Sequence, residues 1–206
     1  MEKPRSFYKR NYKTFKRFEG LLLSNTVLER GLVVATVIMV GNSLKKAVGL
    51  SIVFFLLTFF TICITRIIPK SMPTTFQVII KTMISAGLFI PTAMLVDYIF
   101  PNFSLSVGIF MPLLITNSLI VGLSSSRFHA KKFTPMVVDL LSHILGFAIV
   151  ICLVGAIREI LGNASIWDIP IESFPKAPAI LLPFSGFIIV GFLAALLQKI
   201  KVGVRE

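Results

Sequence analysis

Apolar residues dominate the chain in runs that reach about 20 residues, and short polar connections separate these runs. An α-helix needs a run of about this length to cross the hydrocarbon core of a bilayer. The pattern therefore predicts an all-α, polytopic membrane protein with six transmembrane helices. The expected spans are Leu21–Val40, Ala47–Thr65, Phe76–Ile99, Ser106–Leu123, Met136–Ile157 and Ala179–Leu197.

Six spans account for nearly the whole chain and leave no room for a separate soluble domain. We expect a basic amphipathic segment at residues 1–20, a single six-helix transmembrane domain at 21–200 and a short basic tail at 201–206. In the first segment Tyr8, Tyr12 and Phe15 recur at helical spacing, which suits a helix lying on the membrane surface. No short apolar stretch with a cleavage site follows the early charges, so the pattern does not indicate a signal peptide.

The fourth predicted span is interrupted by polar and helix-breaking residues. It contains Pro112 and the polar step Thr116-Asn117-Ser118. Lipid offers no partners to exposed backbone groups, so such an interruption is tolerable only against neighbouring protein or an internal cavity. We interpret Thr116, Asn117 and Ser118 as a candidate polar site near the middle of the membrane.

The first span has a pattern similar to the fourth. Gly31–Gly41 can be laid over Pro112–Gly122 without gaps, and three spans separate the two segments, so they would run in opposite directions through the membrane. The alignment predicts two inverted three-helix repeats with interrupted first and fourth helices.

The composition agrees with a membrane protein: 55% of the residues are hydrophobic, 15% are charged, and the mean hydropathy is +0.89. The net charge of +12 is explained by topology, because basic residues gather in cytoplasmic connections, and we expect no nucleic-acid partner. The charge distribution predicts a cell (inner) membrane protein with both termini in the cytoplasm and membrane lipid around it. The cytoplasmic side receives the bases of 1–20 and then Arg66, Lys70, Lys81, Arg127, Lys131, Lys132, Lys199, Lys201 and Arg205, and the outer side receives Lys45, Lys46, Arg158 and Lys176.

Asp139 and His143 are four residues apart in the fifth span and therefore share a helix face. Such a pair can relay a proton or bind a cation, since ionisable groups inside membranes are costly and often functional. A structural role at the interface remains open for Asp139, which lies close to Lys132.

Other charged residues lie near the ends of the predicted spans. Glu29 and Arg30 either lie at the membrane interface or pair with each other or with a partner, and Asp97 is expected at the interface. Arg158 and Glu159 are expected to form a helix-end ion pair or a contact with a partner subunit. The longest outer connection is predicted to run from Arg158 to Pro178. We find no catalytic triad, phosphate-binding glycine loop or metal-ligand spacing, so no ordinary enzymatic activity is indicated.

Several segments are recognisable together, namely Asn25–Leu28, Ala47–Leu50, Val107–Gly122, Arg127–Lys132, Val154–Asp168 and Leu182–Phe187. The most specific element is the REILGN sequence, because charged and amide residues at the end of an apolar run do not arise from hydrophobic composition. On these segments the chain resembles the membrane subunits of the Rnf and Na+-pumping NADH:quinone oxidoreductase (Nqr) complexes. It is most similar to the E subunit of Rnf and the D subunit of Nqr.

The resemblance implies six spans in two inverted halves and a homologous membrane partner of opposite topology, together with other Rnf/Nqr-like subunits. It also implies a place in a complex that moves electrons between ferredoxin or NADH and other carriers, coupled to ion movement. The resembling subunits carry one cysteine in the first span and one in the fourth, and two partner subunits together hold a [2Fe–2S] cluster.

In this chain the two corresponding positions are Ala35 and Ser118. Neither offers the soft thiolate that an iron–sulfur cluster needs, so we expect no cofactor from this chain. Cys63 and Cys152 lie in other spans. Three hypotheses remain open. The first is a variant electron-transport subunit without its own cluster ligands. The second is a cluster-free transporter that retains the inverted-repeat fold, and the third is a structural assembly subunit with the same fold.

Overall fold

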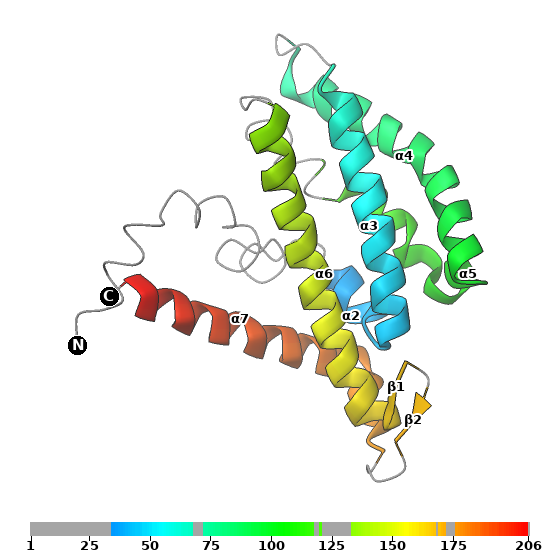
Figure 1. The fold of residues 1–206 in the computed structure, drawn as a ribbon, viewed down its shortest axis with the longest axis vertical. Helices are drawn as coiled ribbons and strands as arrows, with labels where there is room; N and C mark the ends of the chain where they lie inside the picture. Colours follow the sequence, from blue (N-terminus) through cyan, green and yellow to red (C-terminus); the bar gives the residue numbers. More distant parts are fainter. Residues whose placement is uncertain are drawn as a thin grey trace.

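The computed structural model describes residues 34–67, 72–117, 120, 133–167, 169–171 and 176–205, and most of them are helical (Figure 1). This confirms the predicted predominance of helix. The elements in chain order are α2 (Val34–Val40), α3 (Leu44–Thr65), α4 (Thr74–Ile99), α5 (Phe103–Val107), η1 (Gly108–Phe110), η2 (Pro112–Thr116), α6 (Phe133–Asn163), β1 (Ser165–Ile166), β2 (Ile169–Pro170), η4 (Pro178–Leu181) and α7 (Pro183–Arg205).

Helices α3, α4 and α6 are long and apolar enough to cross a membrane. They form the centre of the structure, where α3 packs against α4 on one side and α6 on the other (Figure 1). Phe54 of α3 stacks on Phe147 of α6 with ring centroids 4.0 Å apart. These helices correspond to the second, third and fifth predicted spans.

The last predicted span begins in η4 and continues in α7, whose residues Pro183–Lys199 form a shorter apolar helix. α7 extends to Arg205, so the residues predicted as a separate tail at 201–205 continue this helix. It contacts α2, α6 and η4 and diverges from the direction of the three long helices (Figure 1). Most of the first predicted span, residues 21–33, lies outside the described residues.

The fourth predicted span is interrupted, as expected. Residues 103–116 form the short pieces α5, η1 and η2. Gly108, between α5 and η1, has a φ of +59°, a conformation that favours glycine, and Pro112 begins η2. Because of these breaks, no described part of this segment is a helix long enough to span a bilayer alone.

A break also separates α2 from α3, at residues 41–43. α2 ends close against its neighbours, and a Cβ atom at Gly41 would lie 3.7 Å from Ile151 of α6 and closer still to the Val37 backbone. Glycine is therefore needed where the chain turns. α2 also contacts η1, which precedes the aligned segment Pro112–Gly122.

The connection predicted to begin at Arg158 starts later, because α6 continues to Asn163. Strands β1 and β2 then form a small antiparallel hairpin in which Ile166 pairs with Ile169. The prediction placed Arg158 in the connection because charge is unfavourable in lipid, but the structure buries Arg158 among polar backbone groups.

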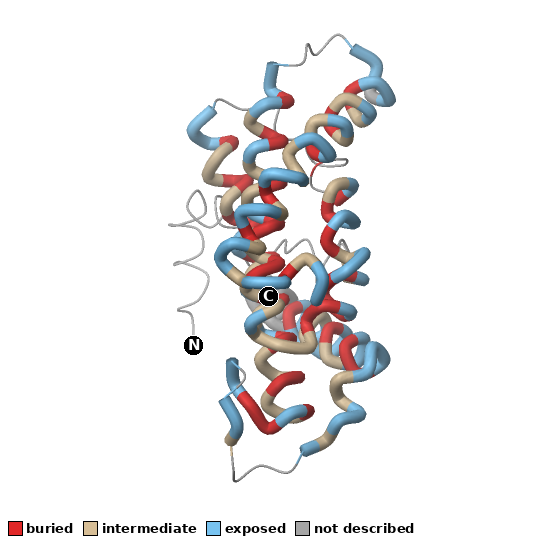
Figure 2. The backbone as a smooth tube through the Cα atoms, turned by 90° about the vertical axis from the view of Figure 1, so that its right-hand side faces the viewer, coloured by how far each residue is buried: buried red, intermediate tan, exposed pale blue. Residues whose placement is uncertain are grey.

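Burial follows the inward faces of the helices (Figure 2). Many of the exposed side chains are large and apolar. On α4, for example, Met83, Ile90 and Met94 are exposed. An outer apolar surface is what a bilayer requires, and the inward faces carry the polar side chains described next.

Candidate functional site: polar side chains buried between the helices

Asn117 follows η2 and turns its side chain into the bundle, where it is only 3% exposed. Its Nδ2 donates to Thr58 Oγ1 of α3 at 3.0 Å and to the Leu114 carbonyl at 3.0 Å. Its Oδ1 accepts a hydrogen bond from the Ile120 backbone N–H at 3.0 Å. One amide side chain thus satisfies backbone groups on both sides of the interruption and ties that interruption to α3.

The other members of the predicted polar step behave differently. Thr116 is exposed, and its hydroxyl donates to the Leu113 carbonyl at 3.3 Å. Ser118 lies outside the described residues. Of the three candidates, Asn117 is the one whose side chain the structure places in the interior.

Asp139 and His143 are both buried on α6, on the face that also carries Phe147. Between them, Ser142 is buried as well, and its hydroxyl donates to the Asp139 carbonyl at 2.7 Å. The shared face predicted from their spacing therefore points into the protein.

Sequence reasoning missed several buried polar residues on α3 and α4. Lys81, counted with the cytoplasmic bases near the start of the third predicted span, lies in α4 and is 0% exposed. Thr61 and Ser85 have buried hydroxyl groups without a hydrogen-bond partner among the described residues. A usable signal was present in α3, since Thr58, Thr61 and Thr65 recur on one face of an otherwise apolar helix.

Two side-chain contacts fix how α3 and α6 align. The helices are antiparallel: Phe54 stacks on Phe147 near their centres, and Arg66 Nη1 donates to Met136 Sδ at 3.5 Å near one end. Thr58 therefore lies near the level of His143.

Lys81 lies at the same end of the bundle as Thr58. α3 ends at Thr65, about 10 Å along the helix from Thr58, and the next helix, α4, begins at Thr74, about 10 Å before Lys81. We refer to the buried polar residues at this end of the bundle, on either side of α3, as the polar cluster: Thr58, Thr61, Lys81, Ser85, Asn117, Asp139, Ser142 and His143.

The described residues do not fit an iron–sulfur cluster. Ala35, on α2, carries a methyl group and no donor atom. Cys152 Sγ lies 4.0 Å from Ser51 Oγ, whereas Cys63 is twelve residues farther along α3, about 18 Å by the rise of an α-helix. These two thiols cannot ligate one cluster. No group of three or more His, Cys, Asp or Glu side chains suited to a metal ion occurs in the described part of the chain.

Arg158 anchors a second polar arrangement, at the opposite end of α6. Its side chain is 1% exposed, and its guanidinium donates hydrogen bonds to the last carbonyls of α2 and of η4. The positive charge thus lies at the ends where backbone carbonyls are unpaired and the helix dipole is negative. The acceptors are the carbonyls of Ile38, Gly41, Ile180, Leu181 and Leu182.

Glu159 has the complementary role at the start of α3. Its Oε2 accepts a hydrogen bond from the Leu44 backbone N–H at 2.6 Å and one from Ser43 Oγ at 3.4 Å. Ser43 makes no side-chain cap of its own, so a carboxylate from α6 caps α3. The side chains of Arg158 and Glu159 are both buried inside this chain, which replaces the expectation that they contact a partner subunit.

Asp97 was expected at an interface, and it caps the short helix α5. Its Oδ1 accepts a hydrogen bond from the Ser104 backbone N–H at 2.7 Å. Glu29 and Arg30 lie outside the described residues.

Comparison with known proteins adds a family match. Residues 14–194 match the model of the family described as "Rnf-Nqr subunit, membrane protein". The E subunit of the ion-translocating oxidoreductase complex of Shewanella oneidensis is 28% identical over 204 residues, covering 92% of this chain and 88% of that protein. The corresponding E subunit of Aliivibrio fischeri is 31% identical, covering 86% of this chain and 85% of that protein. The D subunit of the Na+-translocating NADH-quinone reductase of Pseudoalteromonas translucida is 27% identical, covering 89% and 91% respectively.

Proposed function

Because the chain belongs to the Rnf-Nqr membrane-subunit family, we propose that it is an integral membrane subunit of an ion-coupled electron transport complex. The family match over most of the chain carries this proposal, together with relatives named as subunits of ion-translocating oxidoreductases. The partners are a homologous membrane subunit of opposite topology and other Rnf/Nqr-like subunits. The six spans form two inverted repeats in the cell (inner) membrane, with both termini in the cytoplasm.

Within this class, we propose a variant that supplies no iron–sulfur ligands. Alanine at 35 and serine at 118 support the proposal, as does the separation of about 18 Å between the levels of Cys63 and Cys152 along α3. The chain's own residues support the fold and provide a polar interior.

That polar interior suits an ion or proton path. Asp139 and His143 offer a carboxylate and an imidazole on one buried face of α6, and Thr61 and Ser85 offer buried hydroxyl oxygens. Oxygen ligands suit small hard cations, and an imidazole can carry a proton near neutral pH. Lys81 adds a positive charge on α4 that sets the electrostatic balance of the cluster.

The buried polar residues also favour a second candidate function, a cluster-free transporter that retains the inverted-repeat fold. In that case Asn117 and Thr58 line the polar site that replaces the thiolates. A structural assembly subunit, which uses the fold without any site, is the third alternative left by the sequence.

The deciding experiment measures iron, acid-labile sulfide and the visible spectrum of the protein, purified in mild detergent with the membrane subunits that accompany it. We expect no iron dependent on this chain's thiols, so the Cys63→Ser/Cys152→Ser variant should match the unmodified assembly. A stoichiometric cluster that this double variant loses would contradict the proposal. Ala35→Cys/Ser118→Cys is the reverse variant, and a gain of iron in it would place the family's cluster site at these positions.

Ion coupling is tested separately by reconstituting the complex in vesicles and measuring Na+ uptake and internal pH during electron transport. Asp139→Asn should lower ion movement per electron if Asp139 lies on the path. Unchanged coupling in this variant would contradict the assignment, with Lys199→Gln on the exposed surface of α7 as the control.

A further inference from the structure

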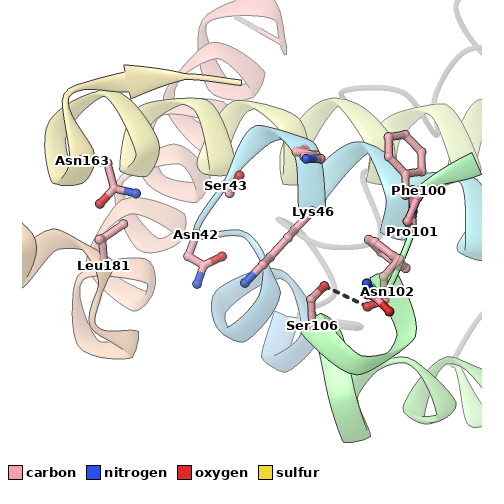
Figure 3. A pocket seen from close by; sticks show the side chains of 11 residues that line it. Asn42, Ser43, Lys46, Phe100, Pro101, Asn102, Ser106, Asn163 and Leu181 are labelled. Atoms are coloured by element: carbon pink, nitrogen blue, oxygen red, sulfur yellow. Dashed lines mark hydrogen bonds between the residues drawn. The ribbon is translucent and has the colours of Figure 1, made fainter. Parts of the chain in front are cut away.

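A polar cavity of about 370 Å³ lies where α2, the start of α3 and the turn between α4 and α5 meet (Figure 3). Lys45 and Lys46 of α3 contribute positive charges, and the amine of Lys46 extends between Asn42 and Ser106. The lining residues are Asn42, Ser43, Lys45, Lys46, Phe100, Pro101, Asn102, Phe103, Ser106, Asn163 and Leu181.

The charge of the cavity selects an anion. Two lysines and three asparagines line it, and none of the described lining residues is acidic. Lys45 and Lys46 lie in the first turn of α3, so an anion bound in the cavity would be stabilised by their charges and by the positive end of the helix dipole.

The position of the cavity selects a lipid. It lies at the first turn of α3 and just beyond the last turn of α4, where two candidate membrane spans end, which is the depth of the headgroups. Tyr98, on the last turn of α4, is 91% exposed, and tyrosine is enriched at this depth. Leu105 beside the lining residue Ser106 is also exposed and offers an apolar surface for acyl chains.

One polar atom narrows the choice of headgroup. Asn42 Oδ1 is buried without a hydrogen-bond partner among the described residues, and a buried acceptor requires a donor. A fully ionised phosphodiester has no donor to offer, whereas a glycerol headgroup carries hydroxyl groups. We therefore propose that this cavity binds the headgroup of an anionic phospholipid of the phosphatidylglycerol type, with its phosphate on Lys45 and Lys46 and a headgroup hydroxyl on Asn42.

The test is calorimetric titration of the full-length protein in detergent with soluble dihexanoyl phosphatidylglycerol, dihexanoyl phosphatidylcholine and inorganic phosphate. We expect phosphatidylglycerol to bind more tightly than phosphatidylcholine. Lys45→Gln and Lys46→Gln should each weaken binding about fivefold, the effect of one basic residue at an anionic membrane surface. Lys199→Gln makes the same charge change on the exposed surface of α7 and should leave binding unchanged.

Lys45→Arg/Lys46→Arg keeps both charges and should retain binding, so this variant separates charge recognition from loss of folding. Asn42→Leu should reduce the preference for phosphatidylglycerol over phosphatidylcholine. Equal phosphatidylglycerol binding by the Lys45→Gln/Lys46→Gln variant would overturn the proposal. Binding of inorganic phosphate as tight as that of phosphatidylglycerol would overturn the lipid assignment. If the Lys45→Gln/Lys46→Gln variant lost complex assembly but still bound lipid, the cavity would be assigned to a partner protein instead.

Discussion

Replacing Arg158 with methionine tests whether the guanidinium holds the interrupted elements in place. Methionine preserves much of the side-chain volume but removes all donors to the carbonyls at the ends of α2 and η4. A buried polar group left unpaired costs about 1–3 kcal/mol, and removing one partner from a buried charged arrangement costs about 3–5 kcal/mol in total. We expect a loss of stability in that range.

The assay is thermal unfolding in detergent, followed by the fraction of protein that remains monodisperse. For a chain of this size, 1 kcal/mol corresponds to roughly 2–4 °C, so Arg158→Met should lower the midpoint by about 6–20 °C. Arg158→Lys keeps the charge but lacks the planar guanidinium that reaches several carbonyls. Its unfolding midpoint should lie between those of the unmodified protein and Arg158→Met. A midpoint within about 2 °C of the unmodified protein for Arg158→Met would refute the reasoning.

Three further predictions use the same assay. Glu159→Gln keeps an acceptor near Leu44 but removes the negative charge from the start of α3, so it should lower stability by about 0.5–1 kcal/mol. Glu159→Ala should lower it more, and equal unfolding midpoints for the two variants would contradict the capping role. A Cβ atom at Gly49 would lie 2.7 Å from Phe103 Cζ, so Gly49→Ala should lower stability by about 1–3 kcal/mol. Phe103→Leu should restore part of this stability, and a loss that Phe103→Leu does not relieve would exclude the clash as its cause. Asn117→Leu should lower stability more than Thr58→Val. Asn117 makes hydrogen bonds with Thr58, Leu114 and Ile120, whereas Thr58→Val removes only one acceptor. The reverse order of the two unfolding midpoints would contradict the central role of Asn117.

The apolar pattern was enough to predict the long helices, because the length of an uninterrupted apolar run determines whether a helix can cross a bilayer. It also indicated the interruption around Pro112, since proline and a polar step are exceptional in lipid. Where these helices end was less predictable. α6 continues past Arg158 because carbonyls from distant segments bind its side chain, and no local pattern reveals such partners.

The polar cluster shows the same limit. Spacing alone placed Asp139 and His143 on one face, because helical periodicity is local. Lys81 could not be recognised as buried, since its place near the start of the third predicted span fitted a base at the cytoplasmic side. The bond between Asn117 and Thr58 joins residues that are far apart in sequence, so it becomes visible only when the interruption packs against α3.

The junction at Arg158 and Glu159 also explains how the turn between α2 and α3 is held where the first and second predicted spans meet. Adjacent residues of opposite charge serve opposite kinds of helix end: the guanidinium binds carbonyls where α2 ends, and the carboxylate binds an N–H where α3 begins. Such a turn at the end of two spans is stable when its backbone groups are satisfied in this way. The turn between α2 and α3 therefore depends on side chains of α6 and on the close approach at Gly41.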